Sequence, residues 1–259
     1  STDGGSTTAG CGSAVMRSSF LLGLLAAVLA GCSQTQGTWT APELGGAYGV
    51  ALTPARDPAM DAVMIRAAER GNLAAVRRAH LRGASVLARD QDRRTALVAA
   101  AYGNHLDVAR FLIRAGAEVN AKDVSVQSPY LISTSEVGDD PRLLSLTIAN
   151  GARINAKDSF NGTGLIRAAD RGYPRVVRRL LAEDIDIDHV NRLGWTALHE
   201  AIILGDGSTR YTHVVRLLVD AGADVNLRSQ SDGVSPLQHA QSRGHEQMAD
   251  ILQAAGAQL

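Results

Sequence analysis

The chain has 259 residues, and its 26 Lys and Arg residues balance its 26 Asp and Glu residues, so its formal net charge is zero. Neither charge sign dominates a long run, whereas a nucleic-acid-binding protein is expected to show a basic stripe. The composition therefore argues against nucleic acid as a partner. Both cysteines, Cys11 and Cys32, lie near the start of the chain, so no disulfide or thiolate metal site is expected beyond them.

Residues 1–15 are polar and of low complexity, and they precede a segment with the order of a signal peptide. That segment has one positive charge, Arg17, then an apolar core over residues 20–30, then small residues. The core has about 11 residues, which is too short for a membrane span of ~20 residues. We expect residues 1–15 to be a non-native or disordered leader, Met16 to be the true start, and residues 16–31 to be a signal peptide.

The end of this segment, Leu29-Ala30-Gly31-Cys32, resembles the bacterial lipoprotein signal. The resemblance implies cleavage before Cys32, lipidation of its thiol and acylation of the new amine, and two or more chains anchor a protein stably. It also implies a place in the cell envelope facing the periplasm. Ser33 follows the cysteine where an Asp would imply inner-membrane retention, which favours the outer membrane. Two alternatives stay open. The segment is an ordinary secretory signal peptide and Cys32 is not lipidated, or the leader is not processed and the protein acts in the cytoplasm.

Residues 32–58 contain the lipidation candidate and then a stretch rich in Gly and Pro with no clear period. Such composition predicts a flexible linker. A random coil of about 26 residues spans ~30 Å on average, enough to hold a domain away from lipid headgroups. Alternatively, Trp39 and Tyr48 fold back onto the following domain or the membrane surface.

From residue 59 onward the sequence repeats with a period of 33, which is typical of a stacked helical solenoid. Thr and Ser open five copies, where a hydroxyl can cap the start of a short helix, and Pro129 and Pro236 suit the first helical position. Glycines end the second helix of most copies because glycine readily adopts the left-handed conformation. The copies open near Ala62, Thr95, Ser128, Thr163, Thr196 and Ser235.

The copies resemble the ankyrin repeat over residues ~60–259. The resemblance rests on Thr196-Ala-Leu-His199 as the opening and on Ala221-Gly-Ala-Asp-Val-Asn226 as the close. It implies an all-α solenoid of about six helix-turn-helix repeats with β-hairpin loops, over residues 59–259. The third and fifth copies carry insertions, and Ser133-Thr134 replaces a pair of alanines in the third, which predicts looser packing there.

No catalytic motif stands out, and we expect no enzyme activity, no cofactor, no metal and no small-molecule substrate. His199-Glu200 begins a zinc-type His-Glu-x-x-His motif, but Ile203 occupies the place of the second histidine. The ankyrin resemblance implies instead that His199 forms hydrogen bonds between repeats. His239 is less typical and is expected to face the groove. The acidic residues 183–188 lack the glycine of a calcium loop, so solvated carboxylates are the simpler interpretation.

The resemblance further implies that a protein partner lies along the concave surface made by the loop tips and first helices. Exposed aromatic and Arg residues are the usual energetic anchors of such interfaces. Two alternatives stay open: Trp195 is either exposed or packed over Leu193, and Arg167 either meets a partner or pairs with Asp170 in its own helix. The candidate contact residues are Arg66, Arg70, Arg93, Tyr102, Phe160, Arg167, Arg171, Trp195 and Glu200.

These features together predict a membrane-anchored, extracytoplasmic adaptor that binds a protein partner and concentrates it near the membrane. A periplasmic inhibitor or immunity-type protein that blocks a specific enzyme or toxin is the main alternative. A cell-wall hydrolase is a third hypothesis, although no acid, base or metal-ligand set supports it.

Overall fold

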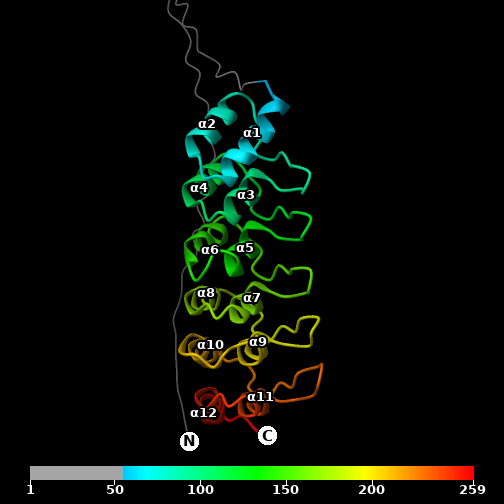
Figure 1. The fold of residues 1–259 in the computed structure, drawn as a ribbon, viewed down its shortest axis with the longest axis vertical. Coiled ribbons are helices and arrows are strands. Elements are labelled where there is room, and N and C mark those ends of the chain that lie inside the picture. The colour runs from blue at the N-terminus through cyan, green and yellow to red at the C-terminus, as the bar shows by residue number, and fades with distance from the viewer. Residues whose placement is uncertain (1–54) are drawn as a thin grey trace, which may run out of the picture. The chain divides into compact units, whose positions relative to one another are not determined.

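The computed structural model of the chain describes residues 55–259, which form a single stack of helices (Figure 1). Consecutive helices pack as pairs, and each pair contacts the next, so six repeats follow one another along one axis. The predicted leader, signal peptide, Cys32 and nearly all of the predicted linker lie outside the described residues. The helices are α1 Pro58–Glu69, α2 Leu73–Leu81, α3 Ala96–Tyr102, α4 Leu106–Arg114, α5 Pro129–Ser135, α6 Pro141–Ile148, α7 Gly164–Asp170, α8 Pro174–Leu180, α9 Ala197–Ile203, α10 Thr209–Asp220, α11 Pro236–Ser242 and α12 Glu246–Ala254.

The first helix of each of the last five repeats starts at the predicted hydroxyl cap. In each case the side-chain oxygen accepts a hydrogen bond from the backbone N–H three residues later. Such a bond satisfies one of the free N–H groups at a helix start and contributes about 1 kcal/mol. Pro129 and Pro236 occupy the first turn of their helices, as predicted. The capping residues are Thr95, Ser128, Thr163, Thr196 and Ser235.

Five of the second helices are followed by a glycine in the left-handed conformation, as predicted. The φ angles of these glycines lie between 84° and 93°. At Gly83 an added Cβ would also lie only 2.1 Å from the carbonyl oxygen of Ala55, so this position requires glycine for space as well. The five are Gly83, Gly116, Gly151, Gly222 and Gly256.

The apolar core forms two clusters that meet in the third repeat. Tyr130, Leu131 and Leu144 belong to the cluster that runs on to the last repeat, whereas Ile132 and Leu143 belong to the cluster of the first two repeats. Ser133 and Thr134, the pair for which looser packing was predicted, are fully buried. Their hydroxyls donate to the backbone carbonyls of Tyr130 and Leu131 at 2.6 and 2.7 Å. The buried polar atoms are therefore satisfied within their own helix.

The loops between repeats project from the first-helix side of the stack and give five tips along one edge (Figure 1). Neighbouring tips are joined by backbone hydrogen bonds, such as that from Arg192 N–H to the carbonyl of Phe160 at 2.9 Å. The predicted β-hairpins are present as tight turns: over residues 55–259 the isolated antiparallel bridge between Lys157 and Thr163 is the β-pairing observed. None of the helices in this range is long and apolar enough to cross a membrane.

Candidate functional site

Four of the loop tips are held by an Asp or Asn side chain at the start of the loop. In each, one oxygen accepts hydrogen bonds from the backbone N–H groups two and four residues later, which closes the turn. Sequence reasoning missed these residues, although they recur at the same intervals as the repeat openings. They are Asp90, Asp123, Asp158 and Asn191.

In Asp123, Asp158 and Asn191 the other side-chain polar atom bonds to a predicted contact residue. Asp123 accepts a hydrogen bond from the hydroxyl of Tyr102 at 2.8 Å. Burial and this bond raise the pKa of Tyr102 above its ordinary value. Asn191 donates to Oε1 of Glu200 at 2.6 Å. The tips therefore hold the first-helix side chains that lie behind them.

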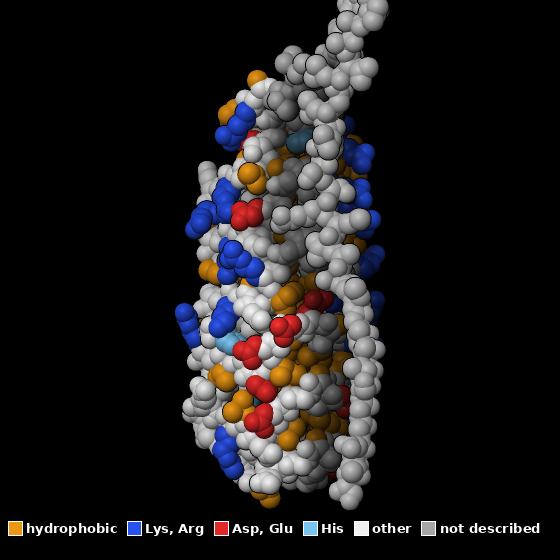
Figure 2. All heavy atoms as spheres, turned by 180° about the vertical axis from the view of Figure 1, so that it is seen from behind, with side chains coloured by type: hydrophobic (Ala, Val, Ile, Leu, Met, Phe, Trp, Pro, Cys, Tyr) orange, Lys and Arg blue, Asp and Glu red, His pale blue; other side chains and the backbone are white. Residues whose placement is uncertain are grey.

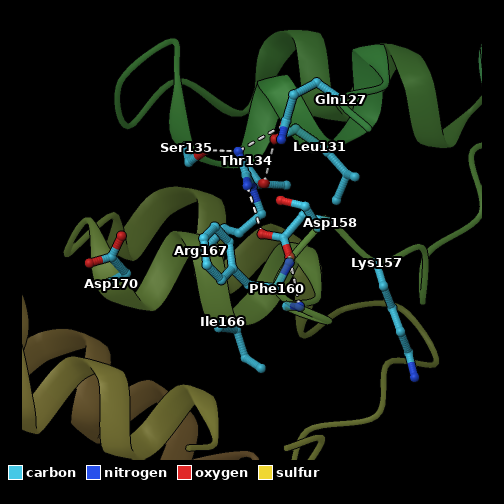
Figure 3. Close-up of polar contacts among 12 residues, drawn as sticks. Gln127, Leu131, Thr134, Ser135, Lys157, Asp158, Phe160, Ile166, Arg167 and Asp170 are labelled. Carbon is cyan, nitrogen blue, oxygen red and sulfur yellow. Dashed lines mark hydrogen bonds and ion pairs between the residues drawn. The ribbon is translucent and has the colours of Figure 1, made fainter. Parts of the chain in front are cut away.

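Arg167 of α7 is the most extensively bonded of the predicted contact residues (Figure 3). Its guanidinium pairs with Asp158 at 2.8 Å and with Glu136 of the preceding repeat at 3.1 Å. It also donates to Ser135 at 2.6 Å and to Gln127 at 3.0 Å. The alternative of pairing with Asp170 in its own helix is therefore wrong. With 13% of its side chain exposed, Arg167 joins the third repeat to the fourth.

Glu200 of α9 is a buried carboxylate, with only 4% of the residue exposed. Apart from Asn191, which bonds to Oε1, no hydrogen-bond donor meets this carboxylate among the described residues. Burial, and then the charge of Asp170, raise the pKa of Glu200 to about 7, while the bond from Asn191 acts in the opposite direction. Within residues 55–259 no Lys, Arg or His forms an ion pair with Glu200, and a carboxylate with a raised pKa in a groove is a candidate for a functional site.

These residues line a groove of about 310 Å³ between the first helices and tips of the third, fourth and fifth repeats. Its lining includes four carboxylates, Glu136, Asp158, Asp170 and Glu200, and two guanidiniums, Arg167 and Arg171. Its rim carries exposed apolar side chains: Phe160 is 63% exposed, and Leu193 and Leu204 are about half exposed. Large exposed apolar side chains beside partly paired carboxylates are suited to binding another molecule.

The other predicted contact residues are spread over the same face. Arg66 and Arg70 are exposed on and just after α1, far along the chain from the groove. Arg93 is exposed at the first tip, where its φ of 59° is left-handed. Arg171 is exposed at the groove and lies 3.7 Å from Asp170. Trp195 is half-buried, and its indole N–H donates to Ser231 of the next tip at 3.0 Å.

Two expectations about histidines are wrong. His239 does not face the groove: it is buried, with its ring edge-on to His199 at 6.1 Å between centroids. His199 forms its hydrogen bonds with the cap residue Thr196 of its own repeat, not with the next repeat. Burial lowers the pKa of His199 to about 4, so it is neutral at pH 7. In the described part of the chain, no three His, Cys, Asp or Glu side chains are grouped so that they could hold a metal ion.

A stack of helix pairs, with projecting loop tips and a groove on the first-helix side, is the architecture of a solenoid repeat protein that presents a binding surface. A model of the ankyrin repeat family, covering three copies, matches residues 51–123 and 131–229. The chain belongs to the ankyrin repeat family.

Two bacterial relatives each cover about three quarters of the chain. The ankyrin repeat protein YahD of Escherichia coli (strain K12) is 34% identical over 192 residues, which is 74% of this chain and 94% of YahD. The crystal structure of an ankyrin repeat domain from Acinetobacter baumannii AYE is 40% identical, with a TM-score of 0.70, and covers 75% of this chain and 98% of that one.

A second similar structure comes from a complex of a predatory endopeptidase of Bdellovibrio bacteriovorus with an immunity protein. The matching chain is 25% identical to this one, with a TM-score of 0.64, and the match covers 74% of this chain and 97% of that chain.

Proposed function

We propose that this protein is a non-catalytic adaptor that binds a protein partner in the groove between its third, fourth and fifth repeats. The observation that carries the proposal is the combination of exposed Phe160, Leu193 and Leu204 with the buried carboxylate of Glu200. Apolar side chains supply most of the affinity of an interface, and a charge at its centre supplies specificity.

The charge of the groove indicates the chemistry of the partner. Arg167 already pairs with Asp158 and Glu136, which leaves Glu200 and Asp170 with only the loosely placed Arg171. A Lys or Arg side chain from a partner would neutralise these carboxylates, and its apolar neighbours would cover Phe160 and the two leucines. The expected partner therefore presents a basic residue between apolar ones.

Replacing both Phe160 and Leu193 by alanine is expected to weaken partner binding more than tenfold, because each truncation of an apolar side chain that anchors an interface costs about 1 kcal/mol or more. Leu87→Ala is the matched control, since Leu87 is also exposed and apolar but does not line the groove. The measurement is the yield of partner captured by crosslinking in membranes. Equal capture by the double variant and by the control would place the binding site elsewhere.

We further propose that the protein is anchored to a bacterial membrane through Cys32 and faces the periplasm, with the outer membrane favoured over the inner. The support is the sequence Leu29-Ala30-Gly31-Cys32 after a short apolar segment. Growth with a radioactive fatty acid should label the natural chain but not Cys32→Ala. If the natural chain takes up no label, or Cys32→Ala is labelled equally, the anchor is wrong.

A second candidate function is inhibition of an envelope enzyme. It is favoured by the similarity to a chain of the endopeptidase and immunity-protein complex. In this case the groove would receive part of the enzyme, and a hydrolase or toxin encoded beside this chain should lose activity when the purified chain is added. Full activity of that enzyme in an equimolar mixture would exclude the inhibitor, whereas the adaptor proposal would stand.

A further inference from the structure

The second helices of the first five repeats form one side of the stack, away from the loop tips, and we call this side the helix-two face (Figure 1). Within their bounds, α2, α4, α6, α8 and α10 contain ten arginines and two carboxylates, Asp107 and Asp220. The corresponding first helices contain two arginines and four carboxylates. Within the helices of these five repeats, the second helices are therefore strongly basic and the first helices slightly acidic.

No long basic run is visible along the sequence because these arginines come in groups of one to three, and each group lies in a different repeat. The fold gathers them, and the expectation that the chain has no basic stripe is wrong for the folded surface. Figure 2, which views the stack from behind, shows Lys and Arg side chains one after another along the upper part of the right-hand edge, and others along the left-hand side. Eight arginines of the helix-two face are exposed and form no ion pair within residues 55–259: Arg77, Arg78, Arg110, Arg114, Arg175, Arg178, Arg210 and Arg216.

Arginines and apolar side chains meet in a hollow of about 370 Å³ between α2 and α4. Arg77, Arg110 and Arg114 line it, and Arg77 lies over the ring of Phe111, 5.6 Å from its centroid. The half-buried side chains of Leu73, Leu106 and Phe111 form its apolar lining, and Asp107 is the one carboxylate there. The hollow therefore offers guanidinium groups for a phosphate beside apolar surface for a hydrocarbon chain.

We propose that the helix-two face binds the anionic phospholipid headgroups of a membrane surface. Each Arg close to an anionic leaflet strengthens binding by about fivefold, so a row of unpaired arginines binds such a surface firmly at moderate salt. Two observations favour lipid over nucleic acid. Apolar side chains lie among the arginines, including Leu81 at the end of α2, which is 73% exposed. In addition, the face is a row of short packed helices with no helix standing out to enter a nucleic-acid groove (Figure 1).

This proposal goes beyond partner binding in the groove and does not depend on the lipid anchor. A solenoid whose helix-two face lies on lipid leaves its loop tips and first helices free for a protein partner. The groove and the helix-two face can therefore be tested separately.

The test is flotation of the full chain carrying Cys32→Ala with vesicles of phosphatidylcholine alone or of phosphatidylcholine mixed with phosphatidylglycerol. The variant removes the lipidation site, and the apolar segment over residues 20–30 is the same in every protein compared. We expect preferential binding to vesicles that contain phosphatidylglycerol, and weaker binding as salt is raised. The triple variant Arg77→Glu, Arg110→Glu, Arg114→Glu should lose at least about tenfold in affinity for these vesicles.

The matched control reverses three exposed arginines outside the second helices, Arg66 of α1, Arg192 of a loop tip and Arg243 just after α11, and should keep the affinity of the parent within about twofold. Circular dichroism checks that each variant is folded, and glutamine replaces glutamate at all three positions if the triple variant is not. Equal binding to both vesicle types, or equal losses in the two triple variants, would overturn the proposal. Tighter binding to duplex DNA than to phosphatidylglycerol vesicles would overturn it in favour of a nucleic acid.

Discussion

Replacing Arg167 by methionine is expected to lower the free energy of unfolding by about 2 to 4 kcal/mol, because the change leaves buried Asp158 and half-exposed Glu136 without their cation. For a domain of this size the loss corresponds to a fall of about 5 to 15 °C in Tm. Thermal and urea unfolding followed by circular dichroism measure it. The variant removes the side chain that joins the third repeat to the fourth, where the two apolar clusters meet.

Arg171→Met is the matched control for this prediction. Arg171 is exposed and lies 3.7 Å from Asp170, so its loss should change stability by less than about 0.5 kcal/mol. Adding Asp158→Asn to Arg167→Met should recover part of the loss, because it removes the unpaired buried charge. If Arg167→Met were as stable as Arg171→Met, the interpretation of Arg167 as a link between repeats would be wrong.

Glu200→Gln is expected to stabilise the protein above pH 7 and to weaken partner binding. The pKa of Glu200 is raised from 4.5 to about 7, so the folded state holds this proton more tightly than the unfolded state does. Ionisation therefore costs stability progressively as the pH rises from about 4.5 to 7. The neutral amide removes that cost. Because the groove is open to water, we expect a gain of about 1 to 2 kcal/mol at pH 8.

The measurement is urea unfolding of both proteins at several pH values between 5 and 8. Comparison at the same pH cancels the other titrating groups, so the stability difference should grow with pH. The affinity for the partner should fall in Glu200→Gln, since the neutral amide cannot form an ion pair with a basic side chain of the partner. A variant that gains stability and keeps full affinity would show that Glu200 is not a contact residue.

The sequence predicted the parts of the fold that depend on neighbouring residues. A hydroxyl such as that of Thr163 caps the helix that directly follows it, and Gly83 ends the helix directly before it, so both can be predicted from local sequence. The tip residues could also have been found. Asp123, Asp158 and Asn191 recur at the repeat interval, and each closes its own loop.

Contacts between repeats could not be predicted in the same way. Arg167 can reach several carboxylates, and only the stacking of the repeats decides that it meets Asp158 and Glu136 instead of Asp170. The burial of His239 against His199 has the same origin. The basic helix-two face was missed because its charge appears only when residues one repeat apart are brought onto one side.

The central claim, that a partner occupies the groove of the first-helix face, is tested most directly by photocrosslinking at single positions. Benzoylphenylalanine is placed at Leu204, on the rim of the groove, or at Leu87, which is equally exposed outside it. We predict that irradiated cells give one protein product from position 204, that Glu200→Gln reduces its yield, and that position 87 gives none. The same product at equal yield from both positions would contradict binding in the groove.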